Sequence, residues 1–520
     1  MNEAHVEVAI IGAGPVGSVG ANLAARHGLS CALIDPSTEV FALPRAIHFD
    51  ADIMRIFQFA GLADRIEPLT RATTGGVHLG IDGEPIRRFR VRDEPGDLGW
   101  RPHYMFFQPE LDALLRRAAA SCPGVLTRFG WRCERVDADD SAAILSLTGP
   151  AGERAELAAE YVIAADGATS PTRVQLGLEL DSYGFEEPWI IIDAQVPAED
   201  LGPDYTIMYC DPERPGTYVP GPGRHRRWEF MVLPGERGEE LQTPHRAREL
   251  VDSVTPWLDG VELDVGRTAV YRFHGLVASK WRAGRVFLAG DAAHQTPPFY
   301  GQGMCHGIRD VRNLLWKLAA VRDDRSGPGL LDTYQAEREP HVRAIIEAAI
   351  ANGRYICTLD REVAVERDVR LRERIEQGAD VRSFREVIPG LSAGLLDDRE
   401  GSDAIGLLFP QPRVTGDDRS PVLLDELLGD RFALISAVPI PDRAACEAWA
   451  ATVGGVVLDL GSTLHDHDGT LERWFDAFGC VAALVRPDRY VFGVAESQID
   501  MGALLNRSAS TLSDLVEERG

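Results

Sequence analysis

The stretch from Arg285 to Met304, RVFLAGDAAHQTPPFYGQGM, contains residues that suit the binding of a large ligand. The apolar run at its start predicts a strand, and Asp291 follows it, so one carboxylate is expected at the rim of a sheet. The prolines and glycines that come next predict a stiff loop that a ligand can approach closely, because Gly301 and Gly303 carry no side chain. A helix is expected from about Met304 to Ala320, with free amides at its N-terminus. An ordinary strand–turn–helix corner is the alternative.

A glycine-rich turn near the N-terminus forms a second candidate site. Residues 6–11 predict a buried strand, the letters GAGPVG at 12–17 open a helix that runs to about His27, and a second apolar run ends in Asp35. This is the strand–turn–helix–strand–acid unit that binds dinucleotides. Asp35 is expected to accept hydrogen bonds from ribose hydroxyls, which a turn used only for packing would not explain.

The glycines of this turn have separate expected roles. Gly12 allows the tight turn, Gly14 lets the backbone approach a pyrophosphate, and Gly17 allows the helix to pack closely on the strand. Pro15 is expected at the start of the helix, whose N-terminus favours anionic phosphates.

A third segment has the same form. The apolar run at 161–165 predicts a strand that ends in Asp166, and Ser170 and Arg173 follow. Alone, these residues could equally be a turn and a solvated helix charge. Three strands that each end in a glycine or aspartate turn favour one shared ligand site.

With these three motifs, the chain resembles the single-component flavoprotein aromatic hydroxylases (group A flavoprotein monooxygenases) of the para-hydroxybenzoate hydroxylase fold. The motifs are GAGPVG at 12–17, DGATSPTR at 166–173 and GDAAHQTPP at 290–298. Within that family the chain is most similar to the 3-(3-hydroxyphenyl)propionate hydroxylase group, on the stretch HQTPPFYGQGMCHGIRDVRNLLWKLA at 294–319.

The resemblance implies an α/β fold. A Rossmann-type (glutathione-reductase-like) FAD domain is expected at 1–75, 100–180 and 270–395, with an inserted mixed-sheet substrate domain at 76–99 and 181–269. A thioredoxin-like domain is expected at 406–520. The patterns themselves agree, since 189–196, 205–209 and 226–233 read as antiparallel strands, and strands alternate with helices after 406. A long helical stretch is expected from about Leu331 to Arg385.

The resemblance also implies that FAD is the cofactor and indicates which residues bind it. The expected FAD-binding residues are Gly12, Gly14, Pro15, Gly17, Asp35, Arg45, Gln108, Asp166, Asp291, Pro298, Gly301, Gly303 and Met304. Pro298 and Gly301 are expected to cradle the reacting ring. His48 is the candidate base, because an imidazole can take a phenol proton near neutral pH, although a backbone-bonded histidine is the alternative.

The implied reaction inserts one oxygen atom of O2 into a phenolic ring through a flavin hydroperoxide. NADH or NADPH would bind only transiently, because the chain has one dinucleotide fingerprint. A 3-(3-hydroxyphenyl)propionate-like substrate is expected, and tailoring of a larger, polyketide-type aromatic is the alternative. A flavin-dependent halogenase would need a lysine-bearing motif that is not seen near the flavin loop, and a flavin-binding sensor is the non-catalytic alternative.

Candidate substrate contacts lie in the patterned segments. Trp189, Met208 and Tyr209 suit a pocket as well as a core, and His225 lies in an arginine cluster that suits either a substrate carboxylate or a solvated turn.

The composition limits the classes of protein to which the chain can belong. The 520 residues, 45% hydrophobic and 26% charged, are enough for two or three domains. A net charge of −26 without a basic patch argues against nucleic acid. Eight scattered cysteines show no metal or redox spacing, so no metal site and a cytoplasmic location are expected, with no signal peptide or membrane span. The C-terminal region is assigned to stability or dimerisation, so a homodimer stays an alternative to a monomer.

Overall fold

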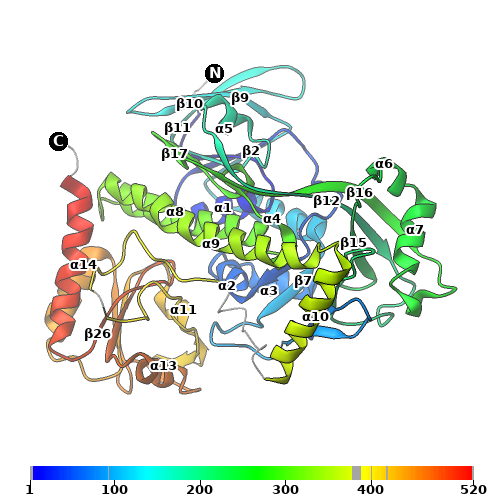
Figure 1. Ribbon diagram of the computed structural model, residues 1–520. Coiled ribbons are helices and arrows are strands. Elements are labelled where there is room, and N and C mark those ends of the chain that lie inside the picture. Colours follow the sequence, from blue (N-terminus) through cyan, green and yellow to red (C-terminus); the bar gives the residue numbers. More distant parts are fainter. Residues whose placement is uncertain (1–3, 92, 378–387, 400, 417–419, 518–520) are drawn as a thin grey trace.

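The computed structural model describes residues 4–91, 93–377, 388–399, 401–416 and 420–517. In Figure 1 one large sheet lies above a pair of long helices, α8 (Gly303–Arg322) and α9 (Thr333–Ile356), and a second lies to their right. A smaller α/β unit built from the C-terminal residues packs beside α8. The mixed α/β class expected from the sequence is confirmed.

The first sheet brings the three sequence motifs to one edge. Its main strands are parallel, and their registers align Ile11 with Ile34 and Ala164, and Ala164 with Leu288. Because the carboxyl ends of parallel strands meet at the same edge, the turns that follow them lie side by side. The strands, in spatial order, are β17 (Arg282–Ala283), β18 (Val286–Leu288), β11 (Arg154–Ala164), β1 (Ala4–Ile11), β2 (Cys31–Asp35) and β8 (Val125–Phe129), with β9 (Arg132–Ala138) and β10 (Ala143–Thr148) paired beside β11.

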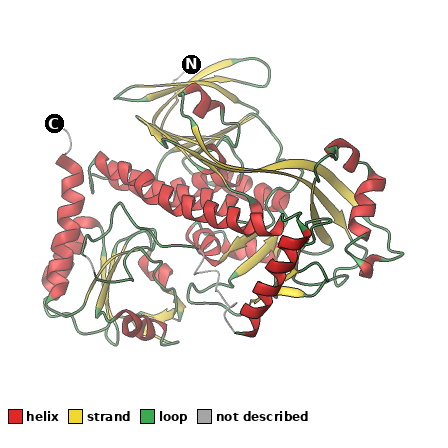
Figure 2. Ribbon diagram, in the orientation of Figure 1, coloured by secondary structure: helices red, strands yellow, loops and turns green. Residues whose placement is uncertain are grey.

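The second sheet is mostly antiparallel and includes the strands expected at 189–196, 205–209 and 226–233. Figure 2 shows its yellow strands extending away from α9, with short helices on the outer side. In spatial order they are β19 (His294–Gln295), β16 (Asp264–Ala278), β12 (Leu180–Gln195), β15 (His225–Met231), β14 (Gly216–Pro220), β13 (Thr206–Tyr209), β5 (Gly75–Leu79) and β6 (Pro85–Arg90).

Helices cover the two sheets and their connections. Those that precede α8 are α1 (Pro15–Arg26), α2 (Ala51–Phe59), α3 (Ala63–Ile66), α4 (Gln108–Ser121), α5 (Pro171–Gln175), α6 (Gly238–Leu241) and α7 (Pro244–Asp252). A three-stranded sheet of β3 (His48–Asp50), β7 (His103–Phe106) and β4 (Thr70–Ala72) lies beside them.

The long helical stretch expected over 331–385 consists of two helices, α9 and α10 (Arg361–Glu376), and residues 378–385 lie outside the described residues. The carboxylate of Asp360 accepts hydrogen bonds from the amides of Glu362 and Val363, so it caps α10 and begins a new helix after a short break. The helical periodicity alone did not reveal this break.

The C-terminal unit has the strand order of a thioredoxin core. Its sheet runs β23 (Val456–Asp459), β22 (Ala433–Ser436), β25 (Ala482–Val485) and β26 (Val491–Ala495), with β22 parallel to β23 and antiparallel to β25. The other elements of this region are β20 (Arg413–Thr415), β21 (Val422–Leu423), β24 (His465–Asp466), α11 (Leu424–Leu428), α12 (Arg443–Val453), α13 (Thr470–Phe478) and α14 (Asp500–Glu517). All eight cysteines of the chain are free thiols.

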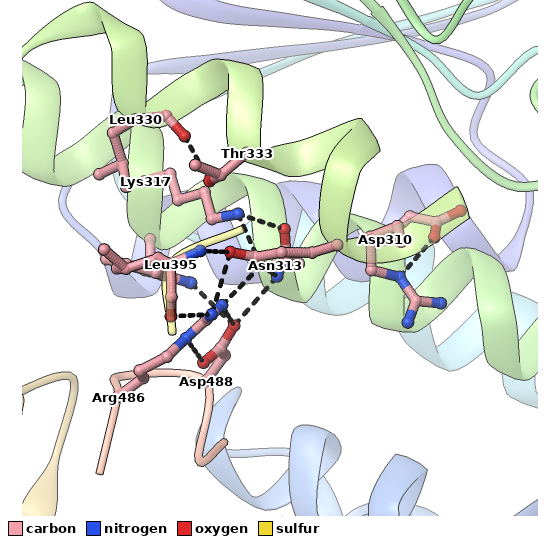
Figure 3. Close-up of polar contacts among 11 residues, drawn as sticks. Asp310, Asn313, Lys317, Leu330, Thr333, Leu395, Arg486 and Asp488 are labelled. Carbon is pink, nitrogen blue, oxygen red and sulfur yellow. Dashed lines mark hydrogen bonds and ion pairs between the residues drawn. The ribbon is translucent and has the colours of Figure 1, made fainter. Parts of the chain in front are cut away.

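A buried ion network joins this unit to α8 and α9. Glu337 lies 2.8 Å from Lys317 and 2.7 Å from Arg486, and Arg486 also pairs with Asp488. Figure 3 shows Arg486 and Asp488 from the C-terminal unit meeting Lys317 and Asn313 of α8. The side chains of the ion pairs are at most 1% exposed, so the docked arrangement depends on their mutual neutralisation.

Among the described residues, none of the helices combines the length and the apolar character that a membrane crossing requires.

Candidate active site

One cavity of about 1380 Å³ connects the three sequence motifs to the second sheet. This volume exceeds the 300–1,000 Å³ typical of sites for drug-sized ligands, so it has room for a dinucleotide and a second molecule. Nearly all the residues expected to bind the cofactor line it, namely Gly12, Gly14, Pro15, Asp35, Arg45, Gln108, Asp166, Asp291, Pro298, Gly301, Gly303 and Met304. Gly17 is absent from the lining, because it packs inside the turn.

The glycine turn has the geometry that a pyrophosphate needs. Gly12 has a φ of +99°, and a Cβ on Gly17 would come within 1.8 Å of the carbonyl oxygen of Gly12. Both positions therefore require glycine for the turn and for helix–strand packing. A Cβ on Gly14 would meet nothing within 4 Å, so the open face of the turn points into the cavity. The residues present therefore fit a dinucleotide.

Asp35 lies at the same end of the cavity and is held by two groups. Its Oδ2 accepts a hydrogen bond of 2.7 Å from the Ala13 amide, and Arg116 approaches its Oδ1 at 3.1 Å. Arg116 also donates to the carbonyl of Ala13 at 2.8 Å and lines the cavity. The sequence analysis did not identify Arg116, because its position depends on the packing of α4 beside α1, which leaves no local motif.

The second motif stabilises the cavity wall. The carboxylate of Asp166 accepts from the hydroxyl of Ser170 at 2.5 Å and from the amide of Thr172 at 3.1 Å. Arg173 donates to the carbonyls of Ala168 and Ala292, both at 3.0 Å, and so ties this motif to the turn that carries Asp291.

Asp291 projects into the cavity from the short 3-10 turn at Gly290–Ala292. The cavity walls desolvate its carboxyl and raise its pKa, while His294 and Arg45 oppose that rise. A carboxyl in this setting is a strong hydrogen-bond partner for a hydroxyl-rich ligand.

Replacing Asp291 with alanine is expected to lower FAD retention about tenfold to a hundredfold, the loss that one charged hydrogen bond of ~1.5–3 kcal/mol implies. The measurement is the flavin-to-protein ratio after gel filtration and dilution. Asp259→Ala, at an exposed site outside the cavity, is the control. Full flavin occupancy in the Asp291 variant would contradict the assignment.

The loop before α8 is held in place by His48, which also lines the cavity. Gly301 has a φ of +63°, and a Cβ there would lie 3.1 Å from Nδ1 of His48. Nε2 of His48 lies 2.8 Å from Nδ1 of His103, and the backbone of Gly301 hydrogen-bonds to the His48 ring. Burial lowers the pKa of His48 and keeps it neutral. Both ring nitrogens are engaged, which suits His48 for holding the loop better than for taking a proton.

Gln108 acts on the segment that carries Arg45. Its Oε1 accepts from the amides of Arg45 and Ala46 at 2.7 and 2.8 Å, and its Nε2 donates to Asp112. Gln108 thus fixes the backbone that presents the Arg45 guanidinium to the cavity.

The three residues expected to bind substrate lie outside the cavity lining. Trp189 is covered by Phe273 and Phe299, and the hydroxyl of Tyr209 donates to the carbonyl of Val254 on the outer face of the sheet. Nε2 of His225 lies 2.8 Å from Asp193. Met208, the fourth candidate, does line the cavity.

The lining at the second sheet is a row of residues that neighbour one another across four strands. His78 on β5 pairs with Met208 on β13, Met208 with Thr217 on β14, and Thr217 with Glu229 on β15. All four line the cavity. Alternation of polar and apolar residues was the only sequence signal for this row, and it does not say which strands are neighbours.

Comparison with known proteins agrees with a dinucleotide site in this cavity. A family described as "FAD binding domain" matches residues 5–349, and one described as "HcaD C-terminal domain" matches residues 406–510. A probable NADH-specific resorcinol 4-hydroxylase of Rhodococcus jostii (strain RHA1) is 36% identical, over 96% of this chain and 94% of that protein. A 3-(3-hydroxy-phenyl)propionate/3-hydroxycinnamic acid hydroxylase of Burkholderia vietnamiensis (strain G4 / LMG 22486) is 34% identical over 94% of each chain. The structure of aklavinone-11 hydroxylase with FAD and aklavinone has a TM-score of 0.80 at 24% identity, over 98% of this chain and all of that one, and it shows a shared fold.

Proposed function

The chain belongs to the FAD-dependent aromatic hydroxylases, and from that premise we propose how its cavity is used. FAD is the cofactor, a reduced pyridine nucleotide is the electron donor and O2 is the second substrate. Gly12–Gly14 would hold the pyrophosphate of FAD, Asp35 the ribose, Asp291 the ribityl chain, and Pro298–Gly303 the ring. The observation that carries this proposal is the single cavity that joins these four places.

Bound FAD supplies the redox chemistry that activates O2, and the chain's own residues bind and orient. Arg45 offers a cation to the pyrophosphate region. The uncapped N-terminus of α8 favours negative charge beside the loop. Pro298 and Gly301 shape the cradle, and His48 keeps the loop in place.

We propose a phenol with one aromatic ring and a meta substituent as the substrate, with NADH as donor. Two relatives, 36% and 34% identical, are named for resorcinol and for 3-(3-hydroxyphenyl)propionate, and the first is named NADH-specific. The polar groups of the cavity wall favour a substrate that is polar at both ends. At one end of the row His78 lies opposite Arg87, which suits a carboxylate, and Glu229 at the other end suits a hydroxyl.

The experiment measures NADH oxidation by the purified holoenzyme with 3-(3-hydroxyphenyl)propionate, resorcinol, a tetracyclic phenol and the non-phenolic 3-phenylpropionate. The first two are expected to accelerate NADH oxidation and to gain one oxygen atom from isotopically labelled dioxygen. NADPH serves as the comparison donor.

If no phenol accelerates NADH oxidation and no label enters a product, the proposed function is wrong. Acceleration by the tetracyclic phenol alone would favour tailoring of a larger aromatic. Acceleration by 3-phenylpropionate with oxygen insertion would contradict the requirement for a phenol.

We propose the domain division 1–75, 100–180 and 270–395 for FAD, 76–99 and 181–269 for the substrate, and 406–520 for the C-terminal domain. The sheet assignments support it, since β5, β6 and β13 to β15 all belong to the second sheet. We also propose a cytoplasmic protein without nucleic-acid or membrane partners, and light scattering would decide between a monomer and a homodimer.

A further inference from the structure

Glu229 is a carboxylate on the cavity wall that none of the expected cofactor contacts uses. It lies on β15 between Thr217 of β14 and Ile191 of β12, in the row that faces the cavity. Its side chain is 14% exposed. A carboxylate buried to this extent costs free energy unless a ligand or a cation compensates it.

The nearest cation does not compensate Glu229 fully. Arg227 lies 3.8 Å from the Glu229 carboxylate, beyond hydrogen-bonding distance. Its guanidinium is committed elsewhere, donating to Asp193 at 2.8 and 3.2 Å and to the carbonyls of Pro44 and Arg45 at 2.8 and 2.7 Å. In the described part of the chain, no hydrogen bond to the Glu229 carboxylate is found. Its oxygens are therefore free to accept one from a ligand.

The other charged groups near Glu229 pair with one another. Asp193 on β12 pairs with Arg227 and with His225, and Arg267 on β16 lies 3.6 Å from Asp193 and donates to the carbonyl of Pro44. The facing residues of β13 and β14, Met208 and Thr217, do not titrate. Burial raises the pKa of Glu229, which Arg227 and Arg267 oppose and Asp193 reinforces. The carboxyl is thus a stronger base than an exposed glutamate.

The other candidate bases, His48 and His78, already have hydrogen-bond partners. His48 is engaged at both ring nitrogens, as described above. His78 is hydrogen-bonded through Nδ1 to the hydroxyl of Tyr355, and burial lowers its pKa to about 3, so it holds a proton poorly. Three strand spacings of about 4.8 Å separate it from Glu229, about 14 Å across the sheet. The two ends of the row therefore contact different parts of a substrate.

We propose that Glu229 is the catalytic base that accepts the proton of the substrate's ring hydroxyl, an inference that rests on the proposed function. The O–H bond of the phenol breaks, the proton passes to an Oε of Glu229, and the electron pair stays on the phenol oxygen. The ring thereby becomes more nucleophilic at its ortho and para carbons, where oxygen is inserted. The overall oxidation uses the O2 and NADH of the proposed function.

Glu229→Gln, nearly isosteric and unable to take a proton, tests this role. Its kcat for hydroxylation is expected to fall about 10²- to 10⁴-fold, the usual contribution of general base catalysis, with a small change in KM. The wild type should lose activity as pH falls through the raised pKa of Glu229, because the base must be ionised. The variant should lack this acid limb and gain activity only as the phenol itself ionises. Glu229→Asp should restore part of the rate and the acid limb.

A second measurement separates the base from a structural residue. Fluorinated phenols that ionise near neutral pH need no base, so the variant should hydroxylate them within about threefold of the wild-type rate. Flavin occupancy and thermal midpoint report folding, and Glu186→Gln, on the exposed end of β12, is the control. An unchanged kcat, a change confined to KM, or no recovery with acidic phenols overturns the proposal. If the wild type itself hydroxylates no phenol, the proposed function has failed instead.

Discussion

A valine in place of Gly17 is expected to abolish FAD binding and to lower the free energy of unfolding by about 3 kcal/mol or more. A Cβ at this position would lie 1.8 Å from the carbonyl oxygen of Gly12 and 3.2 Å from the side chain of Ile10. A backbone oxygen cannot move as a flexible side chain can, so α1 must separate from β1. Urea unfolding and the flavin-to-protein ratio measure the two effects.

Gly14→Val is the matched control in the same turn. Gly14 has a φ of −68° and an open face, so valine causes neither backbone strain nor a clash with the protein. The free energy of unfolding of the FAD-free protein should change by less than about 1 kcal/mol, the range usual away from special sites. FAD retention should nevertheless fall strongly, because the new side chain occupies the cavity. Equal destabilisation by the two valines would contradict the separate roles of these glycines.

The second large effect is expected from Glu337→Gln in the buried network between α8, α9 and the C-terminal unit (Figure 3). The substitution leaves Lys317 and Arg486 without the carboxylate that both contact. Breaking a buried ion pair by removing one partner typically costs about 3–5 kcal/mol. Thermal unfolding measures the loss, and Glu249→Gln, at an exposed pair with Arg246, should cost less than about 1 kcal/mol.

The same network predicts acid sensitivity. Arg486 and Lys317 outweigh burial and lower the pKa of Glu337 to about 2, below the value of about 4.3 for an unfolded chain. The folded-state pKa is lowered, so the stabilisation is fully present above about pH 4.3 and is lost as pH falls toward 2. Glu337→Gln should therefore flatten the acid limb of a stability–pH profile. If the variant's stability is lower by the same amount at every pH, so that its profile runs parallel to that of the wild type, this role is contradicted.

The cofactor end of the site could be predicted because its requirements are local. Gly12 and Gly17 are required by the geometry of one turn, and Gly14 leaves the face of that turn open. Asp35 ends β2, and Asp291 lies in the short turn that follows β18. Parallel strands in register then bring these turns to one edge. The helix break near Asp360 was missed, because one capping side chain outweighed a continuous helical pattern.

The substrate end could not be predicted in the same way. Met208 and Tyr209 are adjacent in sequence, yet they face opposite sides of the sheet, because successive side chains in a strand alternate. Only Met208 lines the cavity. His225 lies on the same strand as Glu229, but Asp193 engages it. The candidates were chosen by residue type, whereas strand order and register decided which side chains reach the cavity.

The sequence by itself determined the α/β fold, the dinucleotide turn and the flavin loop of this protein, because each depends on residues that are neighbours in the chain. The tertiary structure alone decided that His78, Met208, Thr217 and Glu229 form one wall, and that Arg116 closes the opposite end. It also decided that the His48 ring is hydrogen-bonded, whereas among the described residues no hydrogen bond reaches the Glu229 carboxylate. These outcomes depend on contacts between distant segments, where packing and burial, rather than local spacing, set which polar groups are left for a ligand.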